Sequence, residues 1–124
     1  MFTKGMAGSD GSAETSTAKI QTTASDGWHA SVALSGDIDQ ALAPVLRAEL
    51  QRHIGAGRFF IRIDAARVTS LDSNALNALV TGAALCARAH GSMILMNVPA
   101  PVRRIIEISG LDTVLLIHTA VDSA

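Results

Sequence analysis

Segments with the apolar spacing of helices alternate with short apolar segments along most of this chain, and this alternation restricts its possible folds more than any other feature. Helices are expected near residues 41–54, 74–89 and 102–109, with Val45 in the first and Ala87 in the second on the apolar, core-facing side. Strands are expected near residues 20–25, 28–35, 59–63, 92–98 and 114–117. Strands that alternate with helices pair in parallel through right-handed crossovers. The order β-β-α-β-α-β-α-β therefore predicts a single α/β domain, with a mixed sheet packed with helices.

The first two strands are expected to form an antiparallel hairpin that follows a disordered arm. Residues 1–18 are small and polar, without a period, so the domain is expected to span 19–124. Asp26-Gly27 separates the two strands and predicts a turn with positive φ. The apolar side chains of the second strand fall on one face, which is expected to point inward: Trp28, Ala30, Val32 and Leu34.

Composition excludes several classes of protein. The 124 residues suffice for one domain, and with 48% hydrophobic and 17% charged residues the chain is globular. Ten Lys and Arg against eleven Asp and Glu leave a net charge of −1, which argues against direct nucleic-acid binding. One cysteine allows no internal disulfide. No apolar run is long enough to span a membrane, and no apolar segment follows Lys4 as it would in a secretory signal. We therefore expect a cytoplasmic domain that does not bind a membrane.

No arrangement of residues typical of catalysis or metal binding stands out. Gly55-Ala56-Gly57 follows a predicted helix and precedes a strand, the reverse of a phosphate-binding loop, so it indicates a helix stop. Cys86 is expected to be a small core residue. The histidines lack metal-ligand spacing and are expected at the surface or at strand edges: His29, His53, His90 and His118. We expect a protein that is not an enzyme and has no cofactor and no metal.

One serine is the exception. Ser73 lies between a predicted strand that ends at Asp64, with its following loop, and the helix that begins near Asn74. A serine at or beside the helix N-cap satisfies a backbone N–H, and this structural role is the commoner one. Alternatively, Ser73 is exposed beside Asp72 where a kinase can reach it, and a phosphate there would add about −1.5 to −2 charges.

Five short motifs in order resemble those of the STAS domains, and within them the anti-sigma factor antagonists. They are LSGDID at 34–39, IRID at 61–64, LDSNAL at 71–76, NVPAPVRR at 97–104 and ISGLD at 108–112. The similarity covers roughly residues 28–118. It implies a STAS fold and a protein that binds an anti-sigma factor.

The resemblance also implies a mechanism. Ser73 would be the phosphorylation site, and the partner an anti-sigma factor with an ATP-dependent serine kinase fold. Binding would free the sigma factor, and phosphorylation would end the binding. Asp39 matches a family aspartate expected near the serine. The predicted partner-binding residues are Asp39, Asp72, Ser73, Asn74, Asn77, Thr81 and Asn97.

The chain departs from the family pattern Asp-Ser-Ser-Gly-Leu at Asn74 and Ala75. The Ala75 methyl group is expected where the partner backbone could approach, which would change the choice of partner. Residues 117–124 leave little room for the family's last helix, so sheet surface could be uncovered, or covered by the arm or by a second copy in a homodimer. Two other functions remain open: a STAS binding module of a lipid-transport or stress-signalling assembly, and a small-ligand or nucleotide-binding domain.

Overall fold

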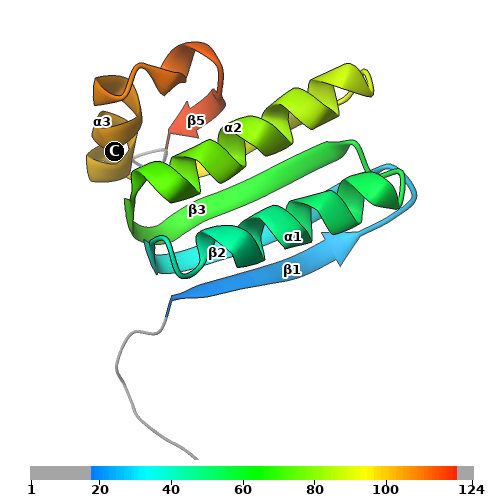
Figure 1. Ribbon diagram of the computed structural model, residues 1–124, viewed down its shortest axis with the longest axis horizontal. Helices are drawn as coiled ribbons and strands as arrows, with labels where there is room; N and C mark the ends of the chain where they lie inside the picture. The colour runs from blue at the N-terminus through cyan, green and yellow to red at the C-terminus, as the bar shows by residue number, and fades with distance from the viewer. Residues whose placement is uncertain (1–17, 120–124) are drawn as a thin grey trace, which may run out of the picture.

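One five-stranded sheet runs through the protein, and its strands lie side by side in the order in which they occur in the chain (Figure 1). The computed structural model describes residues 18–119, so the predicted arm lies almost wholly outside the described residues. The strands are β1 (Lys19–Ser25), β2 (His29–Ile38), β3 (Phe60–Leu71), β4 (Ser92–Val98) and β5 (Leu116–Thr119). The helices are α1 (Ala43–Gly55), α2 (Ser73–Arg88), α3 (Ala100–Ile108) and a 3₁₀ turn, η1 (Leu111–Thr113). The predicted order of elements and the mixed α/β fold are confirmed.

The order of the strands determines where the helices lie. β1 pairs with β2 in the antiparallel sense, whereas β2 to β5 are all parallel. Each parallel connection steps to the next strand in the same direction, so right-handed crossovers place the helices on one face of the sheet. Figure 1 shows α1 and α2 in front of the strands. Within residues 18–119 no helix is both long and apolar enough to cross a membrane.

The core lies between this face and the helices. Buried residues alternate with half-buried ones along most of β2 and with exposed ones along the first half of β3, which is typical of a sheet with one covered face. The helices contribute apolar residues at helical spacing, and α1 and α2 approach each other closely at Gly82, where a Cβ would lie 2.8 Å from the Leu50 Cδ1 atom. The largest fully buried apolar side chains are Val32, Leu34, Ile38, Leu46, Leu50, Ile61, Ile63, Leu79, Val98, Val102 and Ile106.

β3 is longer than predicted. The apolar pattern stops near Asp64, but the strand continues to Leu71 through the segment expected to be a loop. Ala65–Leu71 keeps its pairing with β2, after register shifts that turn Val68 and Leu71 into the core. A bulge of this kind interrupts strict alternation, so the period of two could not find the second half of the strand.

The hairpin is confirmed, but its expected backbone conformation is wrong. Gly27 does not have a positive φ. Instead, the Asp26 carboxylate accepts hydrogen bonds from the backbone N–H groups of Trp28 and His29, at 2.9 and 2.8 Å. These bonds lower the pKa of Asp26. The side chain, and not glycine freedom, therefore holds this turn.

Several residues expected in the core are exposed. Trp28 precedes β2 and is 67% exposed, and Val45 on α1 is 50% exposed. Ala87 on α2 is also exposed, whereas the core face of that helix includes Cys86 as predicted. Burial raises the pKa of the Cys86 thiol, which suits a packing residue.

His53 is the opposite case, because it was expected at the surface and is fully buried. Its ring joins a chain of hydrogen bonds between α1, β1 and the turn after α1. The Arg58 Nε–H donates to His53 Nδ1 at 2.9 Å, so the ring proton lies on Nε2, which is 2.8 Å from the Thr22 hydroxyl. Thr22 donates in turn to Glu49, which also accepts from Arg52 at 2.7 Å. This polar cluster ties the edge strand β1 to α1.

Candidate functional site: the start of helix α2

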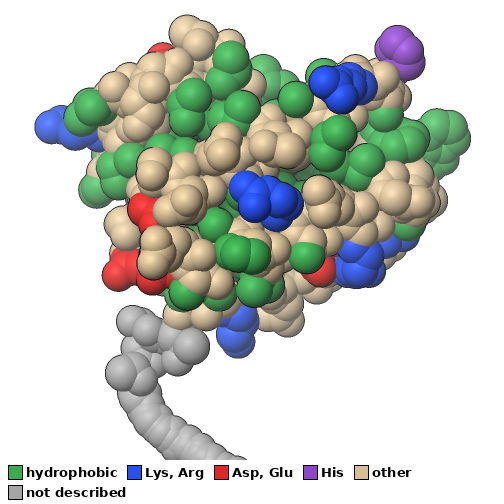
Figure 2. Space-filling model, viewed as in Figure 1, with side chains coloured by type: hydrophobic (Ala, Val, Ile, Leu, Met, Phe, Trp, Pro, Cys, Tyr) green, Lys and Arg blue, Asp and Glu red, His purple; other side chains and the backbone are tan. Residues whose placement is uncertain are grey.

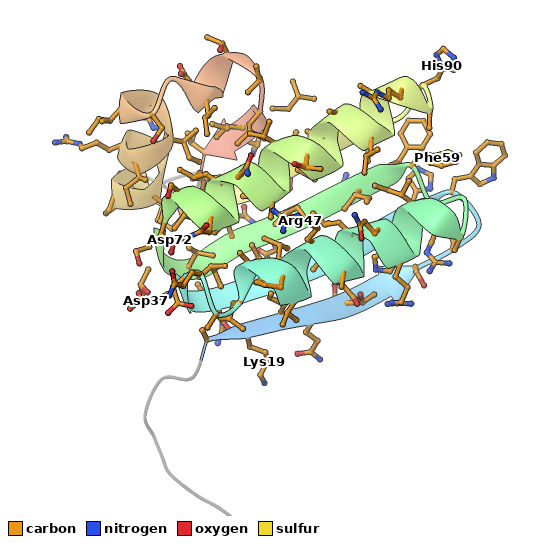
Figure 3. All side chains as sticks on the ribbon, viewed as in Figure 1. Lys19, Asp37, Arg47, Phe59, Asp72 and His90 are labelled. Carbon is orange, nitrogen blue, oxygen red and sulfur yellow. The ribbon has the colours of Figure 1, made fainter. Side chains whose placement is uncertain are left out.

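The carboxyl ends of β2 and β3 bring two junctions together at one edge of the molecule. β2 leads into the turn before α1, and β3 leads directly into α2. The backbone N–H of Asp72 donates to the Ile38 carbonyl at 3.2 Å, which joins the two junctions. Figure 3 shows Asp37 and Asp72 at this edge, with Phe59 and His90 at the opposite one. Loops at the carboxyl ends of parallel strands are a common place for binding sites.

Asp72, and not Ser73, caps α2. The Asp72 backbone is extended, and its carboxylate accepts the N–H of Ala75 at 2.9 Å. Ser73 is the first residue of the helix and is exposed. Within residues 18–119 its hydroxyl has no hydrogen-bond partner. The structural role that the sequence allowed for Ser73 is therefore filled by its neighbour, and the serine hydroxyl is left free at the surface.

Further carboxylates lie near this serine. The Asp37 side chain accepts hydrogen bonds from the hydroxyls of Thr69 and Ser70, the latter at 3.1 Å, and these bonds lower its pKa. Asp39 is exposed in the turn before α1, where its carboxylate accepts the N–H of Ala41 at 3.0 Å. Figure 2 shows acidic side chains gathered at this edge. Phosphorylation of Ser73 would therefore add negative charge beside an already acidic surface.

A groove of about 430 Å³ lies beside Ser73, between α2 and the segment from α3 to η1. The residues that line it are Ser73, Asn74, Leu76, Asn77, Val80, Ser109 and Leu111. Three of these were predicted partner-binding residues, since they share one side of α2. Ser109 and Leu111 were not predicted as site residues, although their motif at 108–112 was recognised. Next to them Ile108 is 80% exposed, an unusual exposure for a large apolar side chain.

The other predicted site residues are less closely grouped. Thr81 is half-buried, one helical turn beyond Asn77. Asn97 has a left-handed backbone at the end of β4, and its amide donates to the Asp64 carboxylate at 3.3 Å. The Asn97 side chain is thus bonded to β3.

Ala75 corrects another expectation. Its side chain is fully buried in the core, so its methyl group does not lie where a partner backbone could approach. Of the two departures from the family pattern, Asn74 is the one that faces outward. Among the described residues there is also no cluster of histidine, cysteine or carboxylate groups that could hold a metal ion.

Solved structures share this fold. An anti-sigma factor antagonist from Mycobacterium paratuberculosis superposes with a TM-score of 0.72 at 24% identity, over 86% of this chain and 90% of that chain. The anti-sigma factor antagonist SpoIIAA in its unphosphorylated form gives 0.71 at 20% identity, over 82% and 89%. The phosphorylated form of SpoIIAA, a cell fate determinant of Bacillus, gives 0.65 at 19% identity, over 82% and 92%. At these identities the likeness establishes the fold alone.

The fold is that of a small α/β domain, and an exposed serine lies at the start of its second helix, beside the carboxyl ends of β2 and β3. The family model described as "Mlab, STAS domain" matches residues 22–118. The chain therefore belongs to the STAS domain family, as the motifs predicted. No curated protein matches it.

Proposed function

We propose that this protein is an anti-sigma factor antagonist, a binding protein and not an enzyme, which is switched off by phosphorylation of Ser73. Its partner would be an anti-sigma factor with an ATP-dependent serine kinase fold, and binding would release the sigma factor. The observation that carries the proposal is the exposed Ser73, whose hydroxyl is not used for capping because Asp72 is the cap. The likeness to anti-sigma factor antagonists of known structure supports the same role.

The proposed binding surface consists of the groove beside α2 and the adjoining carboxyl-end edge. Asn74 and Asn77 supply amide donors and acceptors, and Leu76, Val80 and Leu111 supply apolar surface for a partner side chain. Asp39 and Asp72 would form the acidic side of the interface. Thr81 and Asn97 remain predicted contacts at its margin.

The proposed switch is electrostatic. A phosphate on Ser73 is tolerated by the free protein, because it lies in the first turn of α2, where the helix dipole favours negative charge. In a complex the phosphate would be desolvated near Asp37, Asp39 and Asp72, which costs several kcal/mol without a matched cation. A loss of about 3 kcal/mol weakens binding more than a hundredfold.

The test is co-purification from native cells with tagged wild type, Ser73→Ala and Ser73→Asp, followed by calorimetry with the partner that is identified. We expect an anti-sigma factor kinase to bind wild type and Ser73→Ala, and to be lost with Ser73→Asp. Ser25→Asp is the matched control, since it adds the same charge at an exposed residue at the other end of the sheet. Equal affinity of Ser73→Ala and Ser73→Asp would contradict the proposal.

The same experiment tests the alternative of a lipid-transport or stress-signalling module. This alternative is consistent with the Mlab name of the matching family model, since that name is not specific to sigma-factor control. Transporter subunits recovered equally with all three proteins would favour it. A thermal-shift screen with nucleotides tests the small-ligand alternative separately.

A further inference from the structure

The face of the sheet opposite the helices is not covered by any element within residues 18–119. On β3 this face presents Phe60, Arg62 and Asp64, all of them exposed. The strands beside β3 present their own alternate residues, in register with these three. These neighbours are Ser31, Ala33 and Ser35 on β2, Ile94 and Met96 on β4, and Leu116 on β5. We call this surface the open face.

Apolar side chains are concentrated on one half of the open face. Leu116 is 56% and Phe60 is 36% exposed, and Ile94 and Met96 are half-buried. A depression of about 350 Å³ lies beside them at the amino end of β3. Ile94 is in register with Leu116, and Met96 follows it on the same face of β4, so these three are neighbours. Exposed apolar surface of this kind commonly marks an interaction site.

The charges on β3 indicate which partner fits. Arg62 and Asp64 are two residues apart on the same face of the same strand. Within residues 18–119 neither forms an ion pair. Asp64 accepts hydrogen bonds from the Ala66 N–H and the Asn97 amide, but no cation faces it at ion-pair distance. One strand thus presents a cation and an anion whose positions are exchanged by a two-fold rotation.

We propose that a second copy of this chain packs on the open face and forms a two-fold symmetric homodimer. The axis lies in the plane between the two sheets, runs perpendicular to the strands, and passes over β3 midway between Arg62 and Asp64. It places Arg62 of each copy opposite Asp64 of the other copy, which gives two equivalent ion pairs. By the register of β4 it also places Ile94 opposite Met96 of the second copy, so that the apolar half of each face covers the other.

The same axis accounts for the remaining cations of this face. Ser35 on β2 is in register with Arg67 on β3 and with Lys19 on β1, so these three residues form one row across the sheet. On β2, Ser35 and His29 are each three residues from Val32, which lies beside the axis. The rotation therefore places the row of Ser35 and Arg67 opposite the row of His29 and Phe60 in the second copy. Arg67 then lies opposite the Phe60 ring of the second copy, where a guanidinium group is attracted to the aromatic face. Lys19 lies opposite the hairpin turn with Asp26.

This interface does not depend on the proposed function. It lies on the opposite face of the sheet from α2 and its groove, so Ser73 stays accessible in each copy. Failure of the dimer would leave the phosphorylation switch untouched, and failure of the switch would leave the dimer untouched.

The test uses charge reversal in the full chain, with analytical ultracentrifugation from micromolar to millimolar concentration. Wild type is expected to dimerise. Arg62→Glu places two pairs of like charges in the homodimer, and Asp64→Arg does the same with opposite sign. Each change is expected to raise the dimer dissociation constant by about a hundredfold. A mixture of the two variants is expected to form a heterodimer, because Glu at 62 then faces Arg at 64, and Asp64 faces Arg62.

The mixture distinguishes a contact between copies from a loss of folding. A variant that is merely misfolded cannot be rescued by a second variant, and circular dichroism checks the fold of each. Arg88→Glu is the matched control: it makes the same charge change on exposed α2 and should leave the dimer intact. A wild type that stays monomeric to millimolar concentration would overturn the proposal. So would variants that dimerise like wild type, or a mixture that stays monomeric.

Discussion

Two polar regions of this protein use their side chains in opposite ways. The cluster between β1 and α1 is internal: His53 is fully buried, and both of its ring nitrogens have partners. The edge at the start of α2 is external: Ser73 is exposed, and its hydroxyl has no partner among residues 18–119. In the first region both ring nitrogens of His53 and the Thr22 hydroxyl are bonded within the fold itself. In the second region the Asp72 carboxylate satisfies the helix backbone, and the Ser73 hydroxyl stays exposed.

The difference separates structural from functional polar residues. A buried, fully partnered histidine stabilises one arrangement of β1 and α1, and it offers nothing to a ligand or partner. An exposed serine that makes no bond contributes little to stability and stays accessible to a partner or a kinase. The comparison predicts that changes at His53 alter stability alone, whereas changes at Ser73 alter binding alone.

The largest effect on stability is expected from His53→Ala. This change removes the acceptor for Arg58 and the donor to Thr22 and leaves a cavity beneath β1. The loss is expected to be about 3 kcal/mol in the free energy of unfolding, measured by urea denaturation. His118→Ala, at an exposed histidine on β5, is the matched control and should change stability by less than about 0.5 kcal/mol.

His53→Asn should give an intermediate result, because its amide oxygen can still accept from Arg58. Partner capture through Ser73 should persist in both His53 variants at temperatures where they are folded. If His53→Ala has the stability of wild type, the hydrogen bonds of His53 do not stabilise the packing of β1 on α1, and the contrast with Ser73 is wrong.

A smaller effect is expected from pH. Burial, together with the positive charges of Arg52 and Arg58, lowers the pKa of His53 below its ordinary value of 6.5. The folded state therefore favours the neutral ring, and this contribution to stability is complete above about pH 6.5. It is lost as the pH falls through the lowered pKa, because protonation would set an N–H of the ring against the Arg58 N–H. We expect the urea concentration at the midpoint of unfolding to decrease as the pH is lowered from 7 to 5.

Glu49 does not obscure this test. The hydrogen bond from Arg52, followed by that from Thr22, lowers the pKa of Glu49 to about 2, so its own contribution is lost only below about pH 4.5. His53→Asn is the control, since it removes the titrating ring and should flatten the dependence between pH 7 and 5. An equal slope in wild type and His53→Asn would assign the dependence to other groups.

The sequence predicted the order of elements, the core face of β2 from Ala30 onward, and β4 with its bounds. These rest on local periodicity, which a single sequence carries. It could not predict that Ala65–Leu71 continues β3, because pairing across a bulge is a contact with β2 and breaks the local pattern. It likewise missed the burial of His53, which depends on Thr22 and Arg58, neither of them adjacent in sequence. The sequence offered Ser73 as the candidate site, and that assignment stays a prediction. Which of two neighbouring polar residues caps α2 is decided by backbone dihedral angles, and the extended backbone belongs to Asp72.

The smallest effects are expected at the start of α2, and they test whether Asp72, and not Ser73, caps this helix. Asp72→Ala removes the acceptor for the Ala75 N–H and should cost about 1 kcal/mol of stability, whereas Asp72→Asn keeps an oxygen there and should cost much less. Ser73→Ala should change stability by less than about 0.5 kcal/mol, because no capping bond is lost. Thermal or urea denaturation of the three variants decides the matter. If Ser73→Ala were as costly as Asp72→Ala, the serine hydroxyl would be part of the cap, and the contrast with His53 would disappear. If only Asp72→Ala is costly, the hydroxyl is free in solution as well and stays available for the proposed phosphorylation.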